Sequence, residues 1–236
     1  MLQNVGIDPK LGTVFPLELE FTDEAGETVT LGKYFKENKP VILELVYYGC
    51  PNLCTYLLNG TLEGLKGLKW SAGREFEMVA VSIDPNETPD LASTKKANYL
   101  KEYGRSGSET GWHFLTATEA NVRQLADAVG FRYQYDPEIK QYAHAAGLFV
   151  LTPDGKLART LFGIQFSPRD LRLALVEASE GKVGTIVDRL LLFCYGYDPK
   201  ANKYVLFASN AMKAGGAATI FALSFLVYRL GRKRKT

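Results

Sequence analysis

The stretch 41-VILELVYYGCPNLCTYLLNGT-61 joins two hydrophobic patterns through a glycine. Val41–Tyr48 is a nearly continuous apolar run, which is typical of a buried strand. Gly49 interrupts the run, and leucines then recur at helical spacing, at Leu53, Leu57, Leu58 and Leu62. Cys50 and Cys54 lie at the junction. The stretch therefore predicts a buried strand, a tight turn and a helix that opens at Cys50, with two thiols at its N-terminus.

The composition restricts the class of protein. The chain has 236 residues, of which 46% are hydrophobic and 23% charged, so it can bury a normal core. Its formal net charge of +2 gives no basic face for a nucleic acid, and none is expected as a partner. Of the three cysteines, Cys194 is remote from the close pair and is expected to be a small buried apolar residue. A lone close pair indicates redox chemistry or metal binding.

Two further apolar runs extend the strand–helix pattern. Phe76–Ile83 follows the first helix, and a helix over residues 90–103 leads to a third strand, Trp112–Thr116. Strands that alternate with helices predict a parallel α/β sheet. A helix over residues 119–129, capped by Thr118 and ended by Gly130, continues the alternation.

The remaining elements are shorter. An N-terminal hairpin is predicted at about 13–31, strands at 131–135, 148–151 and 156–162, and a loop at 136–142. A last helix begins with Ser167 as its cap and Pro168 at its first position, and ends near residue 180. The predicted domain spans residues 1–181, and its fold class is α/β with a central mixed sheet flanked by helices.

The spacing of Cys50 and Cys54 places both sulfurs on one face of a helix, within reach of a disulfide. The helix dipole and free N–H groups at a helix N-terminus favour thiolate over thiol. Thiolates attack disulfides and also bind soft metals. Two thiolates with one imidazole suit copper as Cu(I), and Cu(II) where the imidazole is engaged.

The chain offers two histidines for such a site. His144 precedes the strand at 148–151, and this strand could lie beside the one that leads to the cysteines. His113 sits between Trp112 and Phe114 inside a predicted strand, where a structural role is expected. His144 is therefore the candidate third ligand.

The C-terminal region has a different character. No charged residue occurs from Ala214 to Tyr228, and a basic tail follows at 232–236. A membrane span needs about 20 residues, more than this uncharged run provides. Flanking residues extend the expected helix to 211–231, because long basic side chains can reach the membrane surface. Basic residues mark the cytoplasmic side, so the domain is expected to face the periplasm from the cell membrane, joined through an extension at 182–210. The alternative is a buried C-terminal helix. The first 12 residues lack the pattern of a signal peptide.

Taken in order, several motifs resemble the Sco/SenC family. They are Gly49–Cys54 after an apolar strand, Val81–Pro85 followed by Thr88-Pro89, Tyr142–His144 before Gly147–Leu151, Thr152–Gly155, and Phe162-Gly163. The resemblance covers roughly residues 11–181. It implies a thioredoxin-like fold and the handling of copper for cytochrome c oxidase assembly.

The resemblance also implies roles for particular residues. Cys50, Cys54 and His144 would be the copper ligands, and Asp84 would support the site without being a ligand. The partners would be the copper-bearing oxidase subunit or other copper chaperones. The chain departs from the family at Asn52 and Thr55, where an acid and a second proline are usual. Its C-terminal apolar helix replaces the usual N-terminal anchor, and a bacterial subgroup is similar in this respect and through residues 194–199.

Four functions are compatible with these features. The first is a metallochaperone that holds one copper ion. The second is a membrane-tethered thiol–disulfide oxidoreductase in which Cys50 attacks and Cys54 resolves. A peroxidase of the peroxiredoxin type is disfavoured, because the turn before Cys50 lacks the threonine that such enzymes carry. A respiratory subunit without chemistry of its own is the fourth.

Overall fold

The structure is a computed structural model that describes residues 5–35, 38–50, 53–183, 197–198 and 203–204. The chain divides into two compact units, Met1–Gly184 and Thr185–Thr236. In the second unit the description covers only β11 (Tyr197–Asp198) and β12 (Lys203–Tyr204), which pair antiparallel. Cys194 and the membrane helix expected at 211–231 lie outside the described residues. Within those residues, no helix is both long enough and apolar enough to cross a bilayer.

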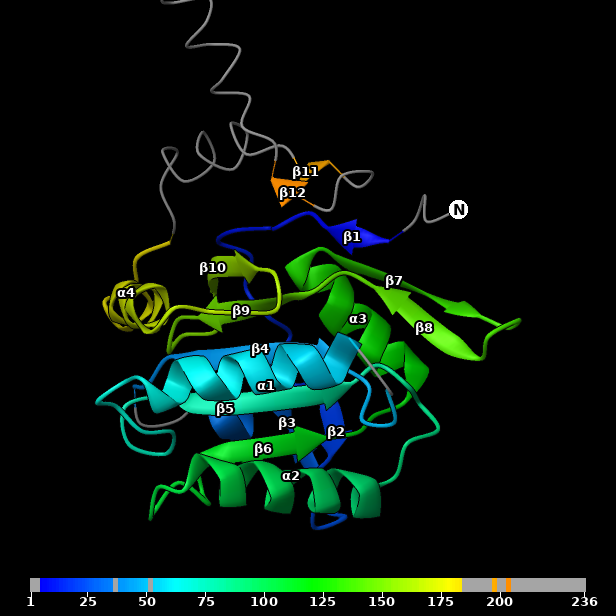
Figure 1. Cartoon of the computed structure of the whole chain (residues 1–236), viewed down its shortest axis with the longest axis horizontal. Coiled ribbons are helices and arrows are strands. Elements are labelled where there is room, and N and C mark those ends of the chain that lie inside the picture. Colours follow the sequence, from blue (N-terminus) through cyan, green and yellow to red (C-terminus); the bar gives the residue numbers. More distant parts are fainter. Residues whose placement is uncertain (1–4, 36–37, 51–52, 184–196, 199–202, 205–236) are drawn as a thin grey trace, which may run out of the picture. The chain divides into compact units, whose positions relative to one another are not determined.

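A five-stranded mixed sheet forms the centre of the first unit (Figure 1), in the order β10-β9-β4-β5-β6. Its strands are β4 (Val41–Val46), β5 (Glu77–Ser82), β6 (Trp112–Leu115), β9 (Gly147–Leu151) and β10 (Leu157–Phe162). β4, β5 and β6 run parallel, while β9 is antiparallel to both β4 and β10. Every residue of β4 is buried, as its continuous apolar run predicts. The predicted parallel core and mixed sheet are confirmed.

Four α-helices accompany the sheet. They are α1 (Leu53–Lys66), α2 (Pro89–Tyr103), α3 (Glu119–Val129) and α4 (Pro168–Ser179). Thr88, Thr118 and Ser167 cap α2, α3 and α4 by accepting a backbone N–H bond three residues on. Each such cap stabilises the folded protein by about 1 kcal/mol. In Figure 1, α1 lies across the face of the sheet, with α2 and α4 at its two sides.

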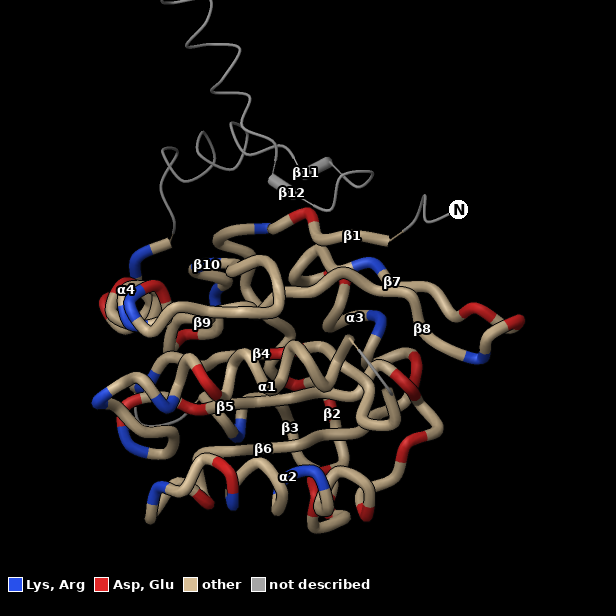
Figure 2. The backbone as a smooth tube through the Cα atoms, viewed as in Figure 1, with Lys and Arg blue, Asp and Glu red and all other residues tan. Residues whose placement is uncertain are grey.

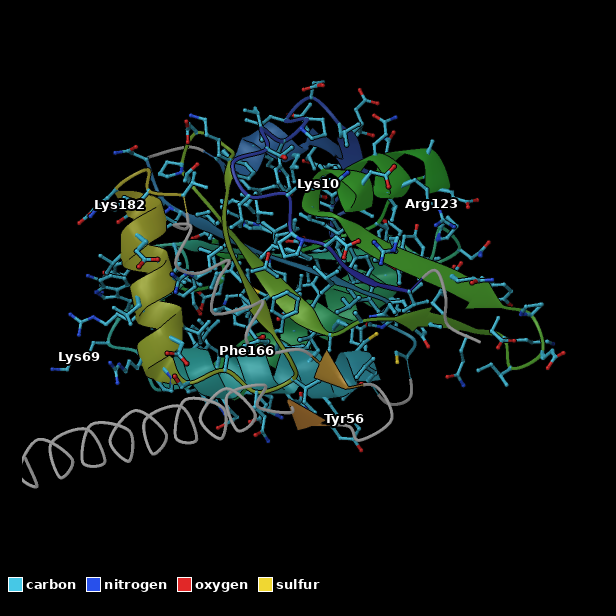
Figure 3. All side chains as sticks on the ribbon, turned by 90° about the horizontal axis from the view of Figure 1, so that it is seen from above. Lys10, Tyr56, Lys69, Arg123, Phe166 and Lys182 are labelled. Atoms are coloured by element: carbon cyan, nitrogen blue, oxygen red, sulfur yellow. The ribbon has the colours of Figure 1, made fainter. Side chains whose placement is uncertain are left out.

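Two glycines of α1 explain how the segment between β10 and α4 packs on this helix. A Cβ atom at Gly60 would lie 1.8 Å from the carbonyl oxygen of Ile164, and one at Gly64 would lie 2.6 Å from that of Phe166. Backbone therefore packs directly against helix, which any larger residue would prevent. Figure 3 shows Phe166 beside α1 in this segment.

Smaller sheets complete the unit. β1 (Gly6–Ile7), β7 (Phe131–Asp136) and β8 (Gln141–His144) form one, in the order β1-β7-β8. β2 (Glu20–Thr22) and β3 (Thr28–Thr30) form the N-terminal hairpin, and the 3₁₀ helix η1 (Leu31–Tyr34) follows it. The prediction of a loop at 136–142 is wrong at both ends, because Asp136 still belongs to β7 and Gln141 and Tyr142 already belong to β8. The hairpin predicted at about 13–31 has its paired strands only at Glu20–Thr22 and Thr28–Thr30.

Charge is distributed around the periphery of the first unit. In Figure 2 the Lys and Arg segments alternate with Asp and Glu segments along the outer helices and loops, while the central strands are almost free of both. Neither sign of charge dominates this view.

Candidate metal and redox site

The topology of the main sheet brings the predicted ligands together. Cys50 and Cys54 follow the end of β4, and His144 is the last residue of β8. β9 pairs antiparallel with β4, with Leu148 opposite Glu44, so β9 begins near the end of β4. The segment that enters β9 therefore carries His144 to the cysteine turn. The prediction that the strand after His144 lies beside the cysteine strand is confirmed.

The contact between Cys54 and His144 is direct. The Sγ atom of Cys54 lies 2.9 Å from Nε2 of His144, and both side chains are buried. Nδ1 of the same imidazole lies 2.9 Å from the carbonyl oxygen of Ala145. A carbonyl oxygen only accepts, so in the neutral ring Nδ1 carries the proton and Nε2 presents its lone pair to the thiol. Burial lowers the pKa of His144, which keeps the ring neutral.

Cys54 is held in an environment that favours the neutral thiol. Its side chain is 1% exposed, and its sulfur accepts a hydrogen bond from the backbone N–H of Tyr47 at 3.4 Å. Burial raises the pKa of the Cys54 thiol far above its usual range. A bound cation would reverse this preference, because a thiol that coordinates a metal does so as the thiolate and releases its proton to the solvent.

Cys50 stands at the start of α1. Its sulfur accepts a hydrogen bond from the backbone N–H of Cys54 at 3.4 Å, so it occupies the place of a side chain that caps a helix. The two thiols also hydrogen-bond to each other, and both are buried. Among the described residues, no three His, Cys, Asp or Glu side chains already stand so as to hold a metal ion.

Tyr47 contacts all three predicted ligands, and its position in the sequence does not reveal this. Its backbone N–H bonds to Cys54, its side chain hydrogen-bonds to Cys50, and its ring packs edge-on to His144 at 6.1 Å between centroids. The Phe131 ring also packs on the imidazole, at 5.9 Å between centroids. The sequence places Tyr47 in an apolar run, where it reads as a core residue.

Asp84 and His113 occupy different places from the ligands. The Asp84 carboxylate accepts a hydrogen bond from the Tyr142 hydroxyl at 3.5 Å, and the Tyr142 ring packs on Tyr47 at 5.6 Å. Asp84 thus reaches the site through two tyrosines. His113 pairs with Val79 near the beginning of β5, contacts Glu77 at 3.2 Å and packs on a tyrosine ring. Its expected structural role agrees with these contacts.

The fold and the cysteine turn define a thioredoxin-like α/β domain with two thiols and one imidazole at the edge of its sheet. The sequence matches the SCO1/SenC family over residues 10–178, and the chain belongs to this family. A search of curated proteins gave no match.

Solved structures share this fold. A protein from Aquifex aeolicus VF5, described as a proposed electron transfer protein, is 25% identical with a TM-score of 0.63, over 73% of this chain and 96% of that one. Copper-bound ScoI of Arabidopsis thaliana is 19% identical with a TM-score of 0.55, over 72% and 99%. BsSco, a member of the Sco family of cytochrome c oxidase assembly proteins in which a disulfide switch was identified, is 22% identical with a TM-score of 0.54, over 75% and 99%.

Proposed function

We propose that this chain is a copper chaperone that binds one copper ion through Cys50, Cys54 and His144. The observation that carries the proposal is the 2.9 Å contact between Cys54 Sγ and His144 Nε2, in which a neutral imidazole turns its lone pair toward a thiol. Two soft sulfur donors and one imidazole nitrogen are a donor set that selects Cu(I) over harder cations. Family membership and the copper-bound ScoI structure support the same assignment.

The chain's own residues have separate parts in this function. The Ala145 carbonyl fixes the His144 tautomer, and Tyr47 orients the sulfurs and the imidazole. Burial of Cys54 keeps the empty site neutral and limits access of water. The recipient is the copper-bearing subunit of cytochrome c oxidase or another copper chaperone, as the assembly role of BsSco supports.

Anaerobic titration with Cu(I) in the presence of a chromophoric competitor tests the proposal. The full chain should bind one equivalent, and a Cys50→Ser/Cys54→Ser variant should bind none. A wild-type protein that leaves all Cu(I) with the competitor would show that the chain is not a copper chaperone.

A second function has its own supporting observation, the placement of two thiols at the start of α1, where the Cys50 sulfur accepts a hydrogen bond from the backbone N–H of Cys54. In a thiol–disulfide oxidoreductase, the Cys50 thiolate attacks a substrate disulfide and releases one substrate thiolate. Cys54 then loses its proton, attacks the Cys50 sulfur and releases the second substrate thiolate. The substrate gains two electrons, the protein retains a Cys50–Cys54 disulfide, and an external dithiol must reduce it again. Turnover with a small disulfide and a dithiol, in the absence of copper, tests this activity.

We also propose that residues 211–231 tether the protein to the cell membrane, with residues 232–236 in the cytoplasm and the domain on the periplasmic side. The support is the uncharged run Ala214–Tyr228 and the basic tail that follows it. Deletion from Ala214 onward should release the protein from the membrane fraction, and a reporter fused after Thr236 should be active in the cytoplasm. Full-length protein recovered without detergent in the soluble fraction would contradict the tether.

A further inference from the structure

Glu87 lies in the segment between β5 and α2 and bonds to the turn that carries Cys50. Its Oε2 accepts a hydrogen bond from the backbone N–H of Tyr48 at 2.7 Å, and its Oε1 accepts one from that of Gly49 at 2.5 Å. These are the two peptide N–H groups that immediately precede Cys50. One carboxylate therefore holds both.

The arrangement of the sheet explains why these groups need a partner. β4 ends at Val46, opposite Ser82 of β5, so Tyr48 and Gly49 lie beyond the strand pairing. In Figure 1, β4 and β5 end side by side, and the segments leading to α1 and α2 both leave from this edge. A carboxylate from one segment can thus reach the backbone of the other. Charged acceptors form stronger hydrogen bonds than neutral ones.

The carboxylate is itself held in place. The Ser82 hydroxyl donates to Glu87 Oε2 at 2.5 Å and accepts from the backbone N–H of Asp84 at 3.1 Å. Ser82 is completely buried at the end of β5. On the other side, a Cβ atom at Gly49 would stand 3.2 Å from Glu87 Oε1, closer than most real contacts. Glycine at this position therefore lets the carboxylate approach the turn.

We propose that Glu87 is a positioning residue that fixes the Cys50 turn and thereby sets the affinity of the site for Cu(I). The inference rests on the proposed copper function, and it assigns to a residue outside the ligand set the task of holding Cys50 beside Cys54. Cys50 directly follows the two residues whose N–H groups Glu87 holds, so the placement of this predicted ligand depends on the turn. The carboxylate also leaves a negative charge near a site that binds a cation, which acts in the same direction.

Glu87→Gln tests the proposal, because glutamine has the same size but has one carbonyl oxygen and an N–H₂ group that cannot accept. Glu75→Gln is the matched control. Glu75 also accepts a backbone N–H bond, from Ser71 at 2.8 Å, but it precedes β5, whereas Glu87 follows it. Both substitutions remove one charge and disturb one loop.

Two measurements on the full chain separate the possible outcomes. The first is hydrogen exchange of the Tyr48 and Gly49 amides without metal, which should accelerate about tenfold or more in Glu87→Gln and stay unchanged in Glu75→Gln. The second is the Cu(I) dissociation constant, which should rise about tenfold in Glu87→Gln only. Unchanged exchange would overturn the hydrogen bonding, and faster exchange with unchanged Cu(I) affinity would overturn the positioning role.

If Glu87→Gln does not fold, Ser82→Ala decides the question. It keeps the carboxylate and removes the hydroxyl that orients it, so a smaller change in the same direction is expected in both measurements, and no change in either would overturn the proposal. Wild-type protein that binds no Cu(I) would remove the proposed function, while the exchange data would still report on the hydrogen bonds of Glu87.

Discussion

Cys54 Sγ and His144 Nε2 lie 2.9 Å apart although 90 residues separate them in the chain. The antiparallel pairing of β9 with β4 produces this contact, since it returns the chain to the end of the strand from which the cysteine turn departs. The Ala145 carbonyl then selects the tautomer in which the imidazole can accept a proton or bind a metal.

Replacement of this imidazole should separate the two candidate functions. His144→Ala removes one of three predicted ligands. Loss of a residue that only supports a metal ligand already weakens metal binding about 10–100-fold, so the Cu(I) dissociation constant should rise about a hundredfold or more. Dithiol exchange with a small disulfide should stay within a few-fold of wild type, because it uses the sulfurs alone. His113→Ala is the control and should leave Cu(I) affinity unchanged. Equal Cu(I) affinity in His144→Ala and wild type would exclude His144 as a ligand.

The Tyr47 hydroxyl should affect the reactivity of Cys50. Tyr47→Phe keeps the ring against His144 but removes the side-chain hydrogen bond to Cys50. A hydrogen bond to a thiolate stabilises it, so alkylation of Cys50 by iodoacetamide at pH 7 should slow several-fold. Tyr142→Phe, which removes the hydroxyl that bonds to Asp84, should alkylate at the wild-type rate. An unchanged rate in Tyr47→Phe would show that this hydroxyl has no part in activating Cys50.

Glu44 should make the stability of the fold depend on pH. This residue of β4 is completely buried, and burial raises its pKa from 4.5 to about 7, although the Thr61 hydroxyl donates to one of its oxygens. Among the described residues, the other oxygen, Oε2, has no hydrogen-bond partner. The folded-state pKa of Glu44 lies above the unfolded value. The contribution of this group to stability is therefore complete below pH 4.5 and is lost as the pH rises through 7.

The predicted size of the effect follows from the shift. A pKa difference of this order corresponds to about 3 kcal/mol in the free energy of unfolding between the two limits. Glu44→Gln should remove this part of the pH dependence while keeping the shape of the side chain. Urea unfolding of both proteins from pH 4 to 8 measures it, and parallel curves for variant and wild type would contradict the assignment to Glu44.

Gly60 should tolerate no side chain. Alanine at this position gains up to about 1 kcal/mol in helix propensity. The added Cβ, however, would meet the Ile164 carbonyl oxygen at 1.8 Å, and overpacking of this kind costs about 1–3 kcal/mol or more. The clash should prevail, so Gly60→Ala should lower the free energy of unfolding, whereas Glu63→Ala on the exposed face of α1 should change it little. Stability equal to wild type in Gly60→Ala would show that the β10–α4 segment can move away.

The sequence was sufficient for the parts of the fold that depend on local patterns. Continuous apolar runs identified β4 and β5, and Thr118 with Gly130 bounded α3 at the observed residues. β8 was missed because Gln141 and Tyr142 follow a charged turn and are not part of an apolar run. They form a strand because they pair with β7, which no local sequence pattern indicates.

The contact between His144 and the cysteine turn was predictable to a similar degree. His144 was predicted as a ligand from its place before an apolar strand, with the family resemblance in support. Tyr47 and Glu87 were not, since each acts through contacts between segments that the sequence keeps apart. In the sequence, Tyr47 lies in an apolar run that is typical of a buried strand, and Glu87 does not differ from other carboxylates in predicted loops. The common edge of β4 and β5 gives Glu87 its neighbours, and β8 brings His144 to Tyr47.

X-ray absorption at the copper edge, on protein loaded with one equivalent of Cu(I), tests most directly the claim that Cys50, Cys54 and His144 form one copper site. Wild-type protein should show two sulfur scatterers and one imidazole nitrogen around the copper. His144→Ala should lose the nitrogen, and Cys50→Ser should lose one sulfur. A wild-type spectrum without the imidazole nitrogen, or one unchanged in His144→Ala, would contradict this claim.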